Sequence, residues 1–225
     1  MANQLDLEEQ EQLDQLKHFW AQYGNLITWL LIAVLAAFSG WNAYKYWQRN
    51  QATQAAALFD ELERVAKSKD TAKLGRVLGD MKDKFASTSY AQQAALVAAK
   101  VYFEEGKSDE AKSTLSWVAE KSSDVGYQAI ARLRLAGILM ESKAFDEALK
   151  QLSNTFPADF AALVADRRGD VYLAQGKKSE AGAEFLKAHQ NLDEGAEYRR
   201  LVEVKLASLG LGVPAPKTGS LGDKK

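Results

Sequence analysis

Residues 164–188 read VADRRGDVYLAQGKKSEAGAEFLKA and give the strongest indication of the fold. Apolar residues recur here at intervals of three and four, which predicts two amphipathic helices. Gly176 lies between them, and glycine readily adopts the left-handed conformation that ends a helix. Small residues at Gly169 in the first helix and Ala181 in the second would let the two helices cross closely. The stretch therefore predicts a tightly packed helical pair.

Two earlier segments repeat this layout. In each, a small residue is followed by a large apolar residue, a turn, and a second alanine after an acidic residue. That second alanine is Ala111, Ala148 or Ala181, so the offsets are 37 and 33 residues. These offsets bracket the tetratricopeptide period of about 34. The middle segment lacks the turn glycine and has Lys143-Ala144 in its place.

The flanks of these segments extend the predicted array. Residues 51–67 and 71–85 resemble a degenerate fourth pair, and Val202–Leu209 would cover the outer face of the last repeat as a capping helix. From Lys45 onward there is neither sustained apolar alternation nor a hairpin dipeptide, so no strand is expected. The prediction is a tetratricopeptide-like α-solenoid of about four helix pairs plus a capping helix. A generic helical bundle is the alternative.

An uncharged run of 26 residues, from Phe19 to Tyr44, precedes the repeats. As a helix it would span about 39 Å at roughly 1.5 Å per residue, more than the hydrocarbon core of about 30 Å. Aromatic residues cluster at both ends, as they do where spanning helices meet the headgroups. The run predicts a transmembrane anchor over residues 19–47. A buried core helix and a cleaved signal peptide are alternatives, although signal peptides begin with basic rather than acidic residues.

Small residues recur along one face of this anchor, where another helix could approach closely. The candidate helix-packing face consists of Ala33, Ala36, Gly40 and Ala43. The alternative is that alanine is simply common in membrane spans.

The complete expectation is an all-α chain in four parts. Residues 1–18 form an acidic tail, 19–47 the transmembrane anchor, 48–209 the repeat domain and 210–225 a disordered tail. The tail carries five acidic residues and one basic residue, whereas residues 45–225 carry 28 basic and 25 acidic residues. There is no clustered basic stripe, so nucleic-acid binding is not expected.

Little in the sequence suggests catalysis. The chain has no cysteine and only two histidines, His18 and His189, neither with a ligand partner at helical spacing. His189 is expected at the surface. We expect no catalytic residues, no metal site and no cofactor, and therefore no enzyme activity.

The sequence predicts a binding role, because solenoids of helix pairs bind partners on a concave face lined by the first helix of each pair. The groove positions in the usual repeat register are Gln93, Leu96, Lys100, Phe103, Ile130, Leu133, Gly137, Met140, Leu163, Asp166, Asp170 and Leu173. The set is largely apolar, which suits extended or unfolded chains. Alternatively, many of these residues pack against a neighbouring repeat or the N-terminal helices.

The anchor stretch LKHFWAQYGNLITWLLIAVLAAFSGWNAYKYWQRNQ, followed by degenerate repeats that end in the stretch quoted first, resembles the YfgM family of ancillary SecYEG translocon subunits. The resemblance spans roughly residues 8–209. It implies a single-pass protein of the bacterial inner membrane, with a cytoplasmic N-terminus and a periplasmic repeat domain. The partners it implies are the SecYEG translocon, a membrane-anchored periplasmic chaperone of the prolyl-isomerase type, secreted polypeptides and a cytoplasmic stress-response regulator.

The leading hypothesis is a membrane-tethered scaffold that assists periplasmic chaperones in handling secreted proteins at the translocon. One alternative is a regulatory protein whose acidic tail binds a stress-response regulator. Another is an assembly factor for a different envelope complex. The local charges do not support the implied orientation, because Lys17 precedes the span whereas Lys45 and Arg49 follow it.

Overall fold

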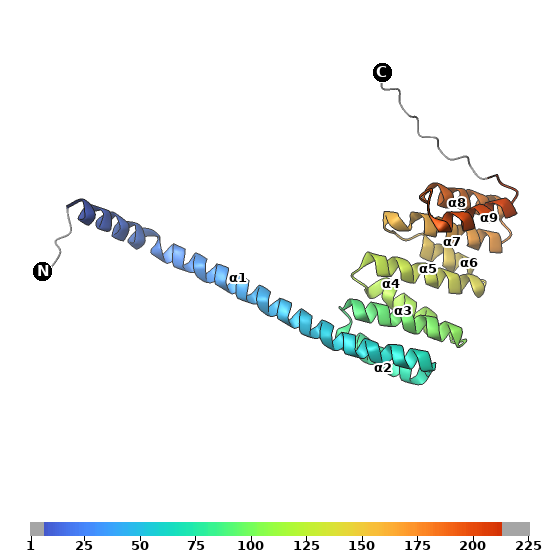
Figure 1. The fold of residues 1–225 in the computed structure, drawn as a ribbon, viewed down its shortest axis with the longest axis horizontal. Helices are drawn as coiled ribbons and strands as arrows, with labels where there is room; N and C mark the ends of the chain where they lie inside the picture. The colour runs from blue at the N-terminus through green and yellow to red at the C-terminus, as the bar shows by residue number, and fades with distance from the viewer. Residues whose placement is uncertain (1–6, 213–225) are drawn as a thin grey trace, which may run out of the picture. The chain divides into compact units, whose positions relative to one another are not determined.

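The computed structural model describes residues 7–212, in which every regular element is a helix (Figure 1). The predicted tails therefore lie partly outside the described residues, at 1–6 and 213–225. The elements are α1 (Leu7–Ser68), α2 (Thr71–Phe85), α3 (Ser89–Glu104), α4 (Ser108–Lys121), α5 (Val125–Glu141), α6 (Phe145–Leu152), the 3₁₀ turn η1 (Ala158–Phe160), α7 (Ala161–Ala174), α8 (Lys178–Gln190) and α9 (Glu197–Ser208). The predicted all-α class is confirmed.

The chain divides into two compact units between Gln54 and Ala55. In the first unit, α1 runs through the whole uncharged stretch and is long and apolar enough there to cross a membrane. Large apolar side chains such as Leu30, Val34 and Phe38 are exposed along it. This exposure does not fit the core-helix alternative, because a core helix would bury these side chains.

The second unit contains the predicted helix pairs, which follow one another as stacked layers in Figure 1. Helices α3 and α4, α5 and α6, and α7 and α8 correspond to the three repeats. The degenerate fourth pair is the last part of α1 with α2, and the chain turns between them at Lys69 and Asp70. The capping helix α9 begins five residues before the predicted Val202, because polar residues such as Arg199 extend it.

The small residues lie at the contact points within the pairs, as predicted. Ala111, Ala148 and Ala181 have no solvent exposure. At Gly169, a Cβ atom would lie only 2.4 Å from Cε1 of the buried Phe185. Real Cβ atoms do not approach carbon so closely, so α7 and α8 can pack at this distance only with glycine at residue 169.

The three repeat turns share one backbone conformation although only two contain glycine. The φ angles of Gly106 and Gly176 are 76° and 78°, and that of Lys143 is 60°. In the middle turn the amide of Lys143 donates to the carbonyl of Met140 at 3.0 Å, and the amide of Ala144 donates to that of Leu139 at 2.8 Å. The tetratricopeptide turn therefore forms in the second repeat at the cost of a strained lysine.

The buried apolar side chains form two separate clusters. The larger extends from the last part of α1 to α7. The smaller joins α7, α8 and α9, and its six fully packed members are Ala165, Ala181, Phe185, Ala188, Val202 and Leu206. The capping helix is thus held by a small core of its own, as expected where a terminal element covers the last repeat.

Two mid-helix glycines allow the close-packing interpretation to be tested. We expect Gly169→Ala to lower the free energy of unfolding by about 2 kcal/mol, because the new methyl group would overlap Phe185. Gly137→Ala is the matched control: its nearest neighbour would be an Arg167 atom at 3.8 Å. This control should raise stability by up to about 1 kcal/mol, since alanine favours the helix. Thermal unfolding of the detergent-solubilised chain, followed by circular dichroism, measures both; equal effects would contradict the interpretation.

The strained turn gives a second prediction. Lys143→Gly should stabilise the chain by about 0.5–1 kcal/mol, because glycine adopts a positive φ without steric cost. The reverse change in an equivalent turn, Gly176→Ala, should destabilise it by a similar amount. Lys143 is exposed, so loss of its side chain should not offset the gain. A lower unfolding temperature for Lys143→Gly in the same assay would show that this turn is not strained.

Candidate functional site

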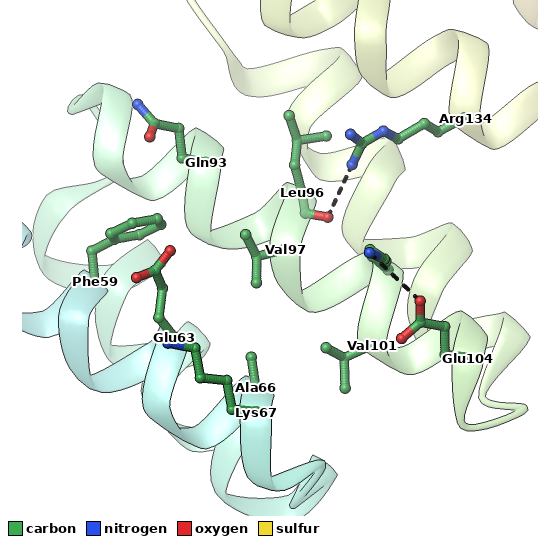
Figure 2. A pocket seen from close by; sticks show the side chains of 11 residues that line it. Phe59, Glu63, Ala66, Lys67, Gln93, Leu96, Val97, Val101, Glu104 and Arg134 are labelled. Atoms are coloured by element: carbon green, nitrogen blue, oxygen red, sulfur yellow. Dashed lines mark hydrogen bonds and ion pairs between the residues drawn. The ribbon is translucent and has the colours of Figure 1, made fainter.

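A pocket of about 570 Å³ opens on the face formed by the first helices of the pairs, and Figure 2 shows its lining. Its apolar wall comes from Phe59 of α1 and from Leu96, Val97 and Val101 of α3. These side chains are buried or half-buried and belong to the larger apolar cluster or pack against it. The charged side chains in the lining are Glu63, Lys67, Lys100, Glu104 and Arg134.

A second pocket of about 470 Å³ lies next along the same face. Phe103 and Ile138 contribute apolar surface, and Gly137 leaves open the space that a side chain would fill. The charged residues of its lining are Lys100, Arg134, Glu141 and Arg167. We call the two pockets together the groove.

Arg134 and Lys100 line both pockets and so join them. The Nη1 atom of Arg134 donates to the carbonyl oxygen of Leu96 at 3.2 Å, which holds the guanidinium over α3 (Figure 2). Lys100 makes a long ion pair with Glu104 at 3.7 Å. Among the side chains of residues 11–212, Arg134 itself makes no ion pair. Most of its donors are therefore available to another molecule.

The third repeat presents a different surface at the equivalent positions. Asp166, which is only 2% exposed, accepts hydrogen bonds from Lys205 Nζ at 2.8 Å and from the hydroxyl of Tyr198 at 2.6 Å. Lys205 also donates to Asp170 at 2.7 Å. Both aspartates therefore face the capping helix α9 rather than an open groove.

This cluster places two carboxylates around one ammonium group. Burial raises the pKa of Asp170 above that of a free aspartate, although the hydrogen bond from Lys205 opposes the rise. Burial and the hydrogen bond to Asp166 raise the pKa of Tyr198. Both Asp166 oxygens accept hydrogen bonds from Lys205 Nζ, and one of them also accepts from Tyr198, so the buried carboxylate is fully hydrogen-bonded, as buried polar groups usually are.

Some of the remaining predicted groove residues line the two pockets, and the others lie outside them. Leu96 and Lys100 line the first pocket, whereas Lys100, Phe103 and Gly137 line the second. Ile130, Leu133 and Met140 are half-buried against the larger apolar cluster. Leu163 and Leu173 are exposed on α7. The groove stays a prediction, now restricted to its first two repeats.

Sequence reasoning missed Arg134 and Arg167, which line the groove although neither was a candidate. A signal was present: Lys100, Arg134 and Arg167 follow one another at 34 and 33 residues, which is the repeat period. The alignment on the buried alanines placed Gly137 opposite Lys100 and so concealed this spacing. Cationic residues at the repeat period are therefore a usable sequence signal for this face.

His189 was expected at the surface, and this expectation is wrong. The ring is only 2% exposed, and its Nε2 accepts a hydrogen bond from Arg199 Nε at 3.1 Å. Glu203 Oε1 lies 3.2 Å from the same nitrogen. Both partners come from α9, so the histidine is buried by the capping helix. Among the side chains of residues 11–212, no group of three histidine, aspartate or glutamate residues could hold a metal ion.

The predicted helix-packing face of the span belongs to the first unit. All four of its small residues lie on the exposed surface of α1. A Cβ atom at Gly40 would meet nothing within 4 Å, so the helix itself does not require glycine there. The packing of another helix against this face stays a prediction.

Comparison with known proteins covers both the anchor and the repeats. The family model of a tetratricopeptide repeat-like domain matches residues 17–211. Proteins named ancillary SecYEG translocon subunit match along 90% of this chain: one from Neisseria gonorrhoeae with 33% identity over 98% of its length, one from Haemophilus influenzae with 29% over 98%, and one from Escherichia coli with 25% over 97%. The chain therefore belongs to the tetratricopeptide repeat-like family of ancillary SecYEG translocon subunits.

Proposed function

We propose that this protein is a membrane-tethered interaction scaffold that associates with the SecYEG translocon of the inner membrane. The observation that carries the proposal is the similarity, over nine-tenths of the chain, to relatives that are named ancillary subunits of this translocon. The exposed apolar stretch of α1 and the helical repeats supply the two parts that such a role needs. The role is binding rather than catalysis.

Tethering makes weak binding effective. A repeat domain held beside its partner by a membrane helix meets that partner at a high effective concentration, so modest affinities suffice. The small residues of α1 support a second part of the proposal. Ala33, Ala36, Gly40 and Ala43 would pack against a membrane helix of the translocon, because close backbone approach is a main source of helix association in lipid.

We further infer that the repeat domain lies on the periplasmic side, where it would receive secreted chains and pass them to a membrane-anchored chaperone of the prolyl-isomerase class. The largely apolar wall of the groove supports this, because unfolded chains expose apolar side chains. The absence of cysteine from the sequence is compatible with an oxidising compartment.

Co-purification with the translocon in mild detergent tests the association. The wild-type chain should retain SecY through affinity purification, and Gly40→Leu should reduce the retained amount by about tenfold because the new side chain blocks close approach. Phe38→Leu changes a residue outside the small-residue face and is the matched control. Failure of the wild-type chain to retain SecY would refute the association. Retention by Gly40→Leu equal to that of the control would refute only the packing face.

Accessibility labelling tests the orientation. Because the sequence has no cysteine, Gln4→Cys and Ser123→Cys each introduce a single reactive thiol. Ser123 is exposed between α4 and α5, so the label can reach it without unfolding the domain. A membrane-impermeant maleimide should label Ser123→Cys in intact spheroplasts and Gln4→Cys only after lysis. The opposite pattern would place the repeats in the cytoplasm and refute the periplasmic role.

A further inference from the structure

We infer that the groove binds an extended polypeptide segment in which one acidic side chain lies between two apolar side chains. Arg134 would bind the carboxylate, and the apolar side chains would enter the two flanking pockets. This inference deepens the proposed scaffold role by naming the chemistry of its ligand, and it rests on that role only for the idea that the ligand is a polypeptide.

The charge at the centre of the groove supports an acidic ligand. Arg134 lines both pockets, and its hydrogen bond to the Leu96 carbonyl fixes its position without neutralising its charge. Arg167 lines the second pocket, and its nearest carboxylate, Asp170, is 3.8 Å away. Lys67 lines the first pocket and makes no ion pair with any side chain of residues 11–212. A planar guanidinium with free donors prefers a carboxylate over other partners.

The acidic residues of the groove itself do not occupy Arg134, so it can still bind a carboxylate of a ligand. Glu63 and Glu104 line the first pocket and Glu141 the second, against four cations in the whole groove. Glu104 is already paired with Lys100 at 3.7 Å. None of these acids pairs with Arg134 in the described chain. The central position therefore remains positive.

The pockets on either side determine what flanks the acidic residue. The first is walled by Phe59, Leu96 and Val97, and the second by Phe103 and Ile138, with open space over Gly137. At about 570 and 470 Å³, each has room for a large aliphatic side chain. Burial of such a side chain favours binding in proportion to the apolar area removed from water.

The position of Arg134 between two pockets favours an internal acidic residue over a terminal carboxylate. A chain end bound at Arg134 could continue in one direction only and would leave one pocket empty. An extended segment continues in both directions, and its alternate side chains point to the same side about 7 Å apart. A segment with the order apolar, acidic, apolar therefore uses the whole groove.

Fluorescence anisotropy with defined peptides tests the inference on the full chain in detergent. The probes are fluorescein-labelled, capped serine-rich 13-residue peptides with a central Asp, Asn or Lys and a leucine two, three or four positions away on each side. At the best spacing, the Asp peptide should bind at least about tenfold more tightly than the Asn peptide, as expected for a charged hydrogen bond. Replacing either leucine by serine should weaken binding by about tenfold.

Variants of the chain separate a specific site from non-specific binding. Arg134→Glu should reverse the preference, so that the Lys peptide binds more tightly than the Asp peptide; misfolding cannot produce such a reversal. Gly137→Leu fills the second pocket and should remove the effect of one leucine. Gly79→Ala lies on α2 outside the groove, and its methyl group would meet no atom within 4 Å, so it is the control and should bind like wild type.

Three results would overturn the inference. The first is equal binding of Asp and Asn peptides at every spacing. The second is an unchanged preference in Arg134→Glu. The third is tighter binding of a peptide that ends at the aspartate with a free carboxylate and carries one leucine. None of these outcomes bears on SecY retention, which is measured separately, so failure of the groove and failure of the proposed function are distinguishable.

Discussion

The close approach of the two helices in each pair is the constraint on which the repeat domain depends. It is most severe at Gly169, where the ring of Phe185 occupies the space of a missing Cβ atom. In the other pairs fully buried alanines such as Ala111 and Ala148 serve the same purpose. Because the two helices of each pair pack closely, the first helices of neighbouring pairs lie near enough for a side chain of one helix to contact the other. Arg134 does this when it bonds the Leu96 carbonyl, so the groove is a product of the same tight packing.

Much of the fold could be predicted because its determinants are local. The repeated alanines and the turn glycines act within about ten residues of one another, so their spacing appears directly in the sequence. Even the turn without glycine formed as expected from its neighbours, with Lys143 in the left-handed conformation. The pattern of the surrounding helices therefore outweighed the preference of one residue, as is usual when tertiary packing and local preference disagree.

The site could be predicted only where its contacts are local too. Leu96, Lys100 and Phe103 line the groove because they share the face of one helix. Asp166 behaves differently because its partners, Tyr198 and Lys205, are 32 and 39 residues further along the chain. Periodicity does not reveal which face of a capping helix meets the last repeat. For the same reason the sequence did not indicate that His189 is buried, because its partners also come from α9. It also did not indicate that Asp166 and Asp170 of the third repeat bond to α9.

The division of the apolar interior into two clusters affects how the domain unfolds. The larger cluster ties the end of α1 to α7, whereas α8 and α9 depend on six packed side chains and the ion cluster at Lys205. Local opening needs only the contacts of the part that opens. The capping helix α9 contributes Val202 and Leu206 to the smaller cluster, so its opening breaks few apolar contacts, while α8 stays packed on α7 and the groove between α3 and α5 stays folded. Heat or protease would therefore act on the capping helix before the binding surface is lost.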